Sequence, residues 1–342
     1  MKRLAEAPSP CPPPSSLPPP VSPTVIEPLA VDVRGLVKSY SGAEIVRGID
    51  LAIRHGEVFA LLGPNGAGKT TTVEILEGYR TRDQGEVSVL GVDPGRQRAM
   101  LKSRIGIVLQ SPGVDRYLTV RETIAMYATF YPHPRSVDEV IDLVGLEEKR
   151  SARVLKLSGG QQRRLDVAIA LVGNPELLFL DEPTTGFDPS ARHEAWEVIK
   201  NLASLGMTVL LTTHYMDEAQ FLADRVAVIV AGRIVAEGPP ATLGGRDLAK
   251  ARIRYRPPAG ETPPGRLFAP PGPDGYTEIT PDDVVEAMHQ LTGWAIDHGS
   301  TLDGLELTRL SLEDIYLSLV ATPPGDTGRR AVPSGNRKGH GK

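Results

Sequence analysis

One short segment combines glycines, a lysine and threonines at the spacing that phosphate groups require. It reads Gly63-Pro64-Asn65-Gly66-Ala67-Gly68-Lys69-Thr70-Thr71, follows the apolar run 58–62 and precedes a helical pattern. Glycines let the backbone wrap around phosphate oxygens with successive N–H groups pointing inward, and the N-terminus of the next helix favours negative charge. Lys69 is expected to place its charge against the β- and γ-phosphates, and Thr70 to offer a hydroxyl to Mg²⁺. The segment predicts a site for a nucleoside triphosphate.

Two adjacent acids follow a buried type of strand further along the chain. The run 177–180 is apolar and ends in Asp181 and Glu182. Successive residues of a strand point to opposite sides, so the two acids need not share a role. Asp181 fits the binding of Mg²⁺ through water, and Glu182 fits a general base that polarises an attacking water. Together with the phosphate-binding segment, this pair is typical of P-loop NTPases.

A third segment, Leu157-Ser158-Gly159-Gly160-Gln161-Gln162, lies before these acids and opens a predicted helix. Ser158 is expected to cap that helix, and the two glycine amides would form a second anion cradle at its N-terminus. In order and spacing the segment strongly resembles the signature sequence of ABC ATPases. The resemblance implies ATP and Mg²⁺, and two subunits that enclose two ATP molecules. Residues 158–161 of one subunit would then cap the γ-phosphate bound by the other.

Two further residues match catalytic positions of ABC ATPases. Gln110 closes the predicted strand 105–109 and resembles the glutamine that contacts Mg²⁺ and the attacking water. His214 follows the predicted strand 208–212 and resembles the switch histidine that holds the γ-phosphate. The resemblance implies that both act with Glu182 in hydrolysis.

Two other residues match positions that contact the nucleotide or the dimer partner. Asp188 resembles the aspartate of the loop at the dimer interface, although Thr185 and Phe187 depart from the commoner Ser and Leu there. Tyr40 precedes the phosphate segment at about the distance of the family's adenine-stacking aromatic residue. An ordinary half-buried tyrosine is the alternative interpretation of Tyr40, because one aromatic residue carries little information.

The C-terminal region indicates a particular group within the ABC ATPases. Residues 310–316 look like the C-terminal element of export ATPases of the daunorubicin-resistance type, and residues 161–165 and 119–122 are similar to that group. This implies export of a drug, an antibiotic or a lipid through a separate permease at the cytoplasmic face of the cell membrane. An import ATPase is the alternative. A soluble ABC ATPase is less favoured, because the chain holds one cassette and a short gap between its motifs.

The elements that must position these residues alternate between strand and helix patterns. This alternation predicts an α/β domain over 29–240, with a mainly parallel RecA-like core, an antiparallel part near its start and a helical subdomain near 115–170. A small α+β appendage is expected over 241–322. Strands are expected at 31–37, 49–53, 58–62, 105–109, 177–180, 208–212, 226–230, 234–236, 251–255 and 305–307, and helices at 120–130, 137–144, 165–172, 191–205, 282–297 and 312–319.

The composition of the chain limits its possible partners and its order. A net charge of −4 gives no whole-chain case for nucleic-acid binding, and one cysteine, Cys11, provides no disulfide framework. We find no apolar run of about 18 residues, so another chain is expected to supply the membrane part. The proline-rich stretch 1–28 and the polar stretch 323–342 are expected to be disordered.

Overall fold

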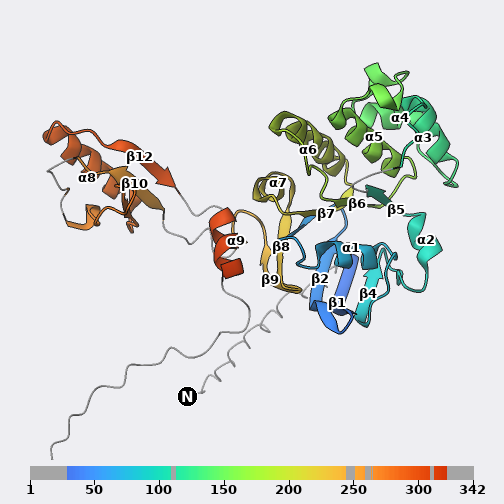
Figure 1. Ribbon diagram of the computed structural model, residues 1–342, viewed down its shortest axis with the longest axis horizontal. Coiled ribbons are helices and arrows are strands. Elements are labelled where there is room, and N and C mark those ends of the chain that lie inside the picture. The colour runs from blue at the N-terminus through green and yellow to red at the C-terminus, as the bar shows by residue number, and fades with distance from the viewer. Residues whose placement is uncertain are drawn as a thin grey trace, which may run out of the picture.

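The computed structural model describes residues 29–108, 113–243, 251–258, 263, 265–308 and 312–321. The predicted tails 1–28 and 323–342 lie outside these residues, as do Leu109 and Gln110. Figure 1 shows a larger body formed by β1 to β9 and a separate small sheet with α8. Among the residues described, no helix is long and apolar enough to cross a membrane.

A six-stranded sheet forms the centre of the larger body, in the order β5–β6–β7–β3–β8–β9. The first five strands are parallel, and β9 returns antiparallel to β8 through a tight turn at residues 231–232. Its strands are β3 (Val58–Leu62), β5 (Ile105–Val108), β6 (Leu177–Asp181), β7 (Thr208–Thr213), β8 (Arg225–Val230) and β9 (Arg233–Gly238). The parallel core expected from the sequence is confirmed.

A second, antiparallel sheet packs on one side of this centre, in the order β2–β1–β4. Its strands are β1 (Leu29–Tyr40), β2 (Ala43–Arg54) and β4 (Gln84–Val89). Alternate residues of β3 serve the two sides of the central sheet: Phe59 and Leu61 join the core shared with this sheet, whereas Val58 and Leu62 join the core under the helices. The central sheet is therefore buried on both faces, which explains its continuous apolar runs.

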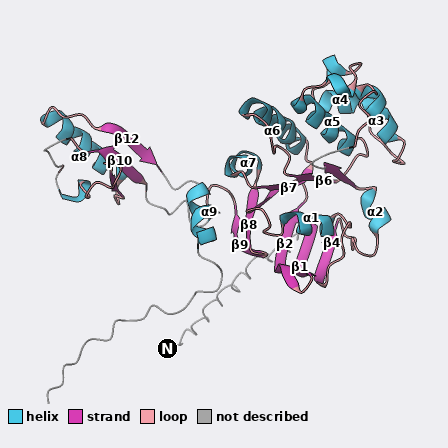
Figure 2. Ribbon diagram, in the orientation of Figure 1, coloured by secondary structure: helices cyan, strands magenta, loops and turns pink. Residues whose placement is uncertain are grey.

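Helices cover the other face of the central sheet, and Figure 2 shows α3, α4, α5 and α6 grouped together. Two begin with a capping box, in which the first side chain and the fourth residue satisfy each other's backbone N–H groups: Thr119 with Glu122, and Ser158 with Gln161. The helices of the larger body are α1 (Lys69–Leu76), α2 (Arg98–Lys102), α3 (Val120–Ala128), α4 (Val137–Leu143), α5 (Gly159–Leu171), α6 (Pro189–Ser204) and α7 (Met216–Leu222), with 3₁₀ turns at Glu147–Lys149 and Val154–Lys156.

The C-terminal region contains a small three-stranded antiparallel sheet, in the order β11–β10–β12. Its elements are β10 (Arg252–Arg256), a 3₁₀ turn (Gly265–Leu267), β11 (Thr277–Ile279), α8 (Val284–Asp297) and β12 (Asp303–Thr308). Its own core includes Tyr255, whose hydroxyl donates to the carbonyl of Leu267 at 2.5 Å. This arrangement is α+β, as expected from the sequence.

The last helix, α9 (Leu312–Ala321), returns to the larger body. It contacts α7, and its Leu312 and Tyr316 belong to the core under the helices of the larger body rather than to the core of the small sheet. The two side chains are 1% and 8% exposed. The chain therefore leaves the larger body after β9 and comes back to it at α9 (Figure 1).

Several elements differ from the sequence expectation. Helix α3 ends at Ala128 rather than at 130. The expected range 165–172 covers only the later part of α5, which begins at Gly159, directly after the predicted cap Ser158. The short α2 and α7 and the strands β4 and β11 were not predicted. Strand β4 has three exposed residues in succession, and β11 has three residues in all. Neither therefore shows the alternation of apolar and polar residues by which a strand is recognised.

We expect Leu312→Ala to destabilise the larger body by about 2–5 kcal/mol, because it removes a buried leucine between α9 and α7. Leu317→Ala on the same helix is the matched control, since Leu317 is 55% exposed. Unfolding in urea, followed by Trp196 fluorescence in a Trp294→Phe background, measures both. Equal unfolding midpoints for the two variants would contradict the docking of α9.

Candidate active site

The phosphate-binding segment forms a tight loop between β3 and α1 that closes on the side chain of Lys69. The Lys69 ammonium donates to the carbonyls of Gly63 at 2.8 Å and Pro64 at 3.2 Å, and its side chain is 4% exposed. Gly63 has no room for a side chain, since a Cβ there would lie 2.3 Å from the Ile229 carbonyl oxygen. Gly68 has φ +105°, a conformation that glycine adopts readily. The loop therefore depends on glycine at these two positions.

Most of the predicted nucleotide-binding residues of this loop, together with the acid Glu182, line one cavity of about 140 Å³. The cavity brings together the loop, the first turn of α1 and the end of β6. Its lining residues are Ile45, Asn65, Gly66, Gly68, Lys69, Thr70, Thr71 and Glu182. Ala67 is buried behind the loop, where its carbonyl accepts a hydrogen bond from Gly232 at 3.0 Å.

One threonine orients both predicted acids. In the parallel pairing of β6 with β7, Asp181 lies opposite Thr212. The Thr212 hydroxyl donates to Asp181 Oδ1 at 2.5 Å and accepts the backbone N–H of Glu182 at 3.1 Å. Burial raises the pKa of the Asp181 carboxyl, the neighbouring Glu182 adds to this, and the Thr212 hydrogen bond opposes it. Thr212 was missed in the sequence, because its role depends on the strand order.

Three side chains converge on the carboxylate of Glu182. Lys69 Nζ and His214 Nδ1 each lie 3.5 Å from Oε1, and the Thr185 hydroxyl donates to Oε2 at 3.2 Å. His214 Nδ1 is buried and has no hydrogen-bond partner among the residues described. A buried nitrogen without a hydrogen-bond partner is suited to bind a ligand that supplies the missing donor or acceptor. The structure thus brings Lys69, Glu182 and His214 together, as the sequence predicted.

The signature residues lie in a second cavity, of about 320 Å³, together with the predicted interface residue Asp188. Ser158 caps α5, and Asp188 caps α6 by accepting the N–H groups of Ser190 and Ala191, each at 3.0 Å. The cavity is lined by Ser158, Gly159, Gly160, Gly186, Phe187, Asp188, Ser190, Ala191 and Glu194. Gln161 contributes through the capping box rather than as a lining residue.

One predicted site residue, Tyr40, stands apart from these cavities, and another, Gln110, is not among the residues described. Tyr40, the last residue of β1, is 37% exposed, and its ring lies 5.5 Å from Lys38 Nζ and 5.6 Å from the Arg80 guanidinium. It lines neither cavity. Gln110 lies outside the described residues, so its predicted role stays a prediction.

A buried carboxylate that the sequence did not reveal connects the loops on either side of this site. Glu218 of α7 is fully buried and accepts hydrogen bonds from the Thr184 hydroxyl at 2.7 Å and the Trp196 indole at 3.0 Å. Burial raises the pKa of this carboxyl, and its hydrogen bonds oppose the shift. Glu218 therefore ties the segment after Glu182 to the helix after His214. The acid lies in a helix of seven residues, too short to show a periodic pattern, so the sequence gave no signal of this contact.

Comparisons with known proteins agree with this geometry. The family model described as ABC transporter matches residues 46–185. The Nod factor export ATP-binding protein I of Rhizobium johnstonii is 44% identical over 223 residues, which cover 64% of this chain and 72% of that protein. The chain belongs to the ABC transporter ATP-binding family. The protein of the same name from Rhizobium sp. (strain N33) is 43% identical over 220 residues, which cover 63% of this chain and 72% of the relative.

Solved structures of ABC cassettes resemble the larger body. The structure of cbiO1 from Clostridium perfringens, part of the ABC transporter complex cbiONQ, has a TM-score of 0.58 and 31% identity, and the match covers 62% of this chain and 89% of that one. A dimeric post-hydrolysis state of the ATP-binding cassette MJ0796 bound to ADP and Pi has a TM-score of 0.54 and 26% identity, covering 61% and 98%. The predicted family and ABC ATPase fold are confirmed, and the chain binds and hydrolyses ATP.

We expect Thr212→Val to lower kcat about tenfold or more, because one hydroxyl orients both Asp181 and Glu182 and a hydrogen bond to a charged group contributes about 1.5–3 kcal/mol. Thr208→Val is the control, since Thr208 lies at the other end of β7 and its hydroxyl accepts only from Gly56 among the contacts described. Steady-state ATP hydrolysis measures both. An equal loss in the two variants would show that the strand, not the hydroxyl, matters.

Proposed function

We propose that this chain is the motor subunit of an ABC exporter. Two copies would close on two molecules of ATP, hydrolyse them and drive a separate permease at the cytoplasmic face of the membrane, with a drug, an antibiotic or a lipid as cargo. The observation that carries the proposal is the convergence of Lys69, His214 and Thr185 on the carboxylate of Glu182 beside the phosphate loop. The relatives named for export favour this direction of transport over import.

The residues of this site would have different roles in ATP hydrolysis. The loop amides and Lys69 would hold the phosphates, and Glu182 would take a proton from the attacking water. His214, whose buried Nδ1 has no hydrogen-bond partner among the described residues, would hold the γ-phosphate. Gln110 would contact the same water, and the Tyr40 ring would stack on adenine.

The oxygen ligands beside the loop fit Mg²⁺. Thr70 supplies a hydroxyl in the cavity, and Asp181 supplies a carboxylate held by Thr212. Among the residues described, no group of three or more His, Cys, Asp or Glu forms a metal cage. Mg²⁺ usually binds through one or two protein oxygens together with substrate phosphates. When bound, Mg²⁺ would neutralise charge on the phosphates, and Thr70, Asp181 and Gln110 would hold it.

The two cavities support a dimer. The cavity of the phosphate loop and the cavity of the signature residues share no lining residue. The start of α5 can therefore bind a phosphate that this copy's own loop does not hold, and a second copy of the chain supplies one if each signature faces the other copy's loop. A related ATPase subunit with the same loop would serve equally. Asp188 lies in the signature cavity and would belong to this interface.

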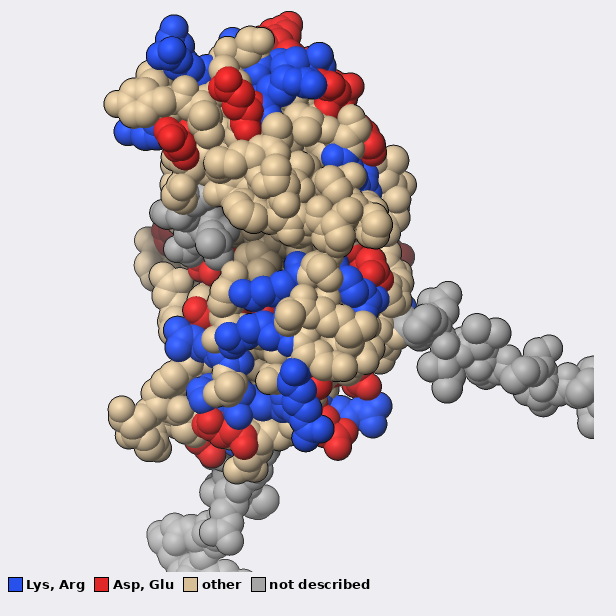
Figure 3. Space-filling model, turned by 90° about the vertical axis from the view of Figure 1, so that its right-hand side faces the viewer, with Lys and Arg blue, Asp and Glu red and all other residues tan. Residues whose placement is uncertain are grey.

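A face with exposed apolar side chains is available to the permease. On and beside α3, Tyr117 and Phe130 are 75% and 73% exposed. Figure 3 shows the side of the molecule that carries α2, α3 and α4, where a broad uncharged area lies above an area rich in Lys and Arg. Exposed apolar patches of this kind mark interaction surfaces. We infer that the permease binds here and that α3 transmits the closure.

We expect Glu182→Gln to lower the rate of ATP hydrolysis at least about 100-fold, because the amide cannot accept the proton of water. ATP binding and the ATP-dependent dimer should persist, since the phosphate loop is unchanged. Glu176→Gln is the matched control, because Glu176 lies at the surface in an ion pair with Arg104. Phosphate release and light scattering measure hydrolysis and dimerisation. Wild-type turnover by the glutamine variant would refute the assigned role.

We expect co-expression with candidate permeases, including any encoded beside this chain, to identify one that gives a membrane-bound complex. Tyr117→Ala and Phe130→Ala should each weaken its co-purification several-fold, because each removes an exposed aromatic side chain from the inferred interface. Leu205→Ala is the control, as Leu205 is 66% exposed at the end of α6. If no permease candidate retains the wild-type chain while it hydrolyses ATP in solution, the transport proposal fails.

A further inference from the structure

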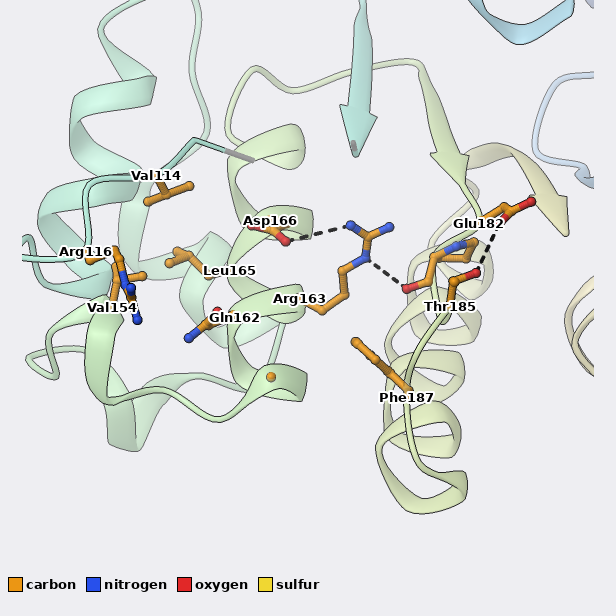
Figure 4. A pocket seen from close by; sticks show the side chains of 12 residues that line it. Val114, Arg116, Val154, Gln162, Arg163, Leu165, Asp166, Glu182, Thr185 and Phe187 are labelled. Carbon is orange, nitrogen blue, oxygen red and sulfur yellow. Dashed lines mark hydrogen bonds and ion pairs between the residues drawn. The ribbon is translucent and has the colours of Figure 1, made fainter. Parts of the chain in front are cut away.

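The backbone just after Glu182 is held by an arginine of the signature helix. Arg163 of α5 donates from Nε to the carbonyl oxygen of Pro183 at 2.9 Å, and Figure 4 shows its side chain reaching from the helix toward the turn that carries Glu182. A cavity of about 630 Å³ lies beside this contact and is lined by both Arg163 and Glu182. The arginine therefore spans a loosely filled space between α5 and the turn.

The turn that Arg163 reaches is strained. Glu182 has φ 45°, in the left-handed region that non-glycine residues avoid. Such a conformation is unfavourable for a non-glycine residue and persists only where the surroundings determine it. On one side Thr212 of β7 holds the Glu182 N–H through its hydroxyl and its carbonyl, at 3.1 and 3.2 Å. On the other side Arg163 donates to the carbonyl oxygen of the following residue, Pro183.

Arg163 is buried together with its own counter-ion. Its side chain is 8% exposed, and Asp166, one turn further along α5, is 10% exposed with Oδ2 3.8 Å from Arg163 Nη1. Burial raises the pKa of Asp166 to about 7, and Arg163 opposes that shift. Arg164, the next residue, points outward to Glu194 at 2.8 Å. A buried ion pair adds little stability, which favours a positional role for Arg163 and Asp166.

We propose that Arg163 is a positioning residue that ties the signature helix to the backbone of Glu182. Arg163 lies five residues after Ser158 on the helix that would cap the partner's ATP. Capture of that ATP at Ser158 and Gly159 would fix the helix, and through Arg163 and Pro183 it would fix the general base of the same subunit. The inference rests on the proposed function, and it links each composite site to the other.

A matched pair of variants tests the hydrogen bond itself. In Arg163→Gln the amide nitrogen occupies the same place along the side chain as Nε of arginine, so it can donate to Pro183. Arg163→Met is of similar length and has no donor. Both are made with Asp166→Asn, so that no buried carboxylate is left without its partner. Arg164→Met serves as the control for losing an arginine from α5.

We call Arg163→Met with Asp166→Asn the methionine pair, and Arg163→Gln with Asp166→Asn the glutamine pair. We expect the methionine pair to lower kcat about tenfold relative to the glutamine pair, with KM for ATP within a factor of two. The glutamine pair and Arg164→Met should stay within about threefold of the wild type. A purely structural role would lower the thermal midpoint and ATP affinity along with kcat. Equal turnover by the methionine and glutamine pairs overturns the proposal. Failure of the methionine pair to fold also overturns it, because a positioning contact leaves the fold intact.

Mixed dimers show which site Arg163 serves. Two differently tagged copies are purified together with the permease, and one copy carries Glu182→Gln. If the methionine pair is placed in that same copy, the remaining activity should be unchanged; if it is placed in the other copy, that activity should fall about tenfold. The reverse pattern would mean that Arg163 acts through the signature on the partner's ATP. A Glu182→Gln homodimer that turns over ATP would instead refute the role of Glu182, independently of Arg163.

Discussion

The burial of one positive charge constrains the geometry of the active site. The Lys69 ammonium group is almost inaccessible to water, and a buried charge is costly unless it is paired and hydrogen-bonded. The carbonyls of Gly63 and Pro64 and the carboxylate of Glu182 meet that need. For both carbonyls to face inward, the loop must fold back on α1. The backbone of Gly63 must then approach β8 so closely that no other residue fits.

The order of the central strands brings the remaining groups to this charge. Strands β6, β7 and β3 are neighbours and parallel, so their carboxyl ends lie along one edge of the sheet. The phosphate loop follows β3, the two acids end β6, and His214 follows β7. Ligands of open α/β sheets bind at this edge. Thr212 is the link between the strands, because one hydroxyl serves the acids on β6 from its place on β7.

The sequence predicted those parts of the site that depend on local spacing. The loop 63–71, the acids after 177–180 and the helix cap Ser158 are each specified by neighbours in the chain, and their places agree with the structure. Contacts between elements far apart in the chain could not be predicted from the sequence. Thr212, Arg163 and Glu218 have residue types that also suit a strand end or a helix face, and only the tertiary packing gives them partners. Short elements such as β11 and α7 lack the length that a periodic pattern needs.

The return of the chain to the larger body limits where the small sheet can travel. Four peptide steps separate Thr308, at the end of β12, from Leu312, which is buried against the core beside α7. Four fully extended steps span at most about 14 Å. The small sheet is thus tethered at both its ends to one rigid body, and its range is set by the shorter tether. The shorter tether joins the sheet to α9, and α9 contacts α7, the helix that begins just after His214.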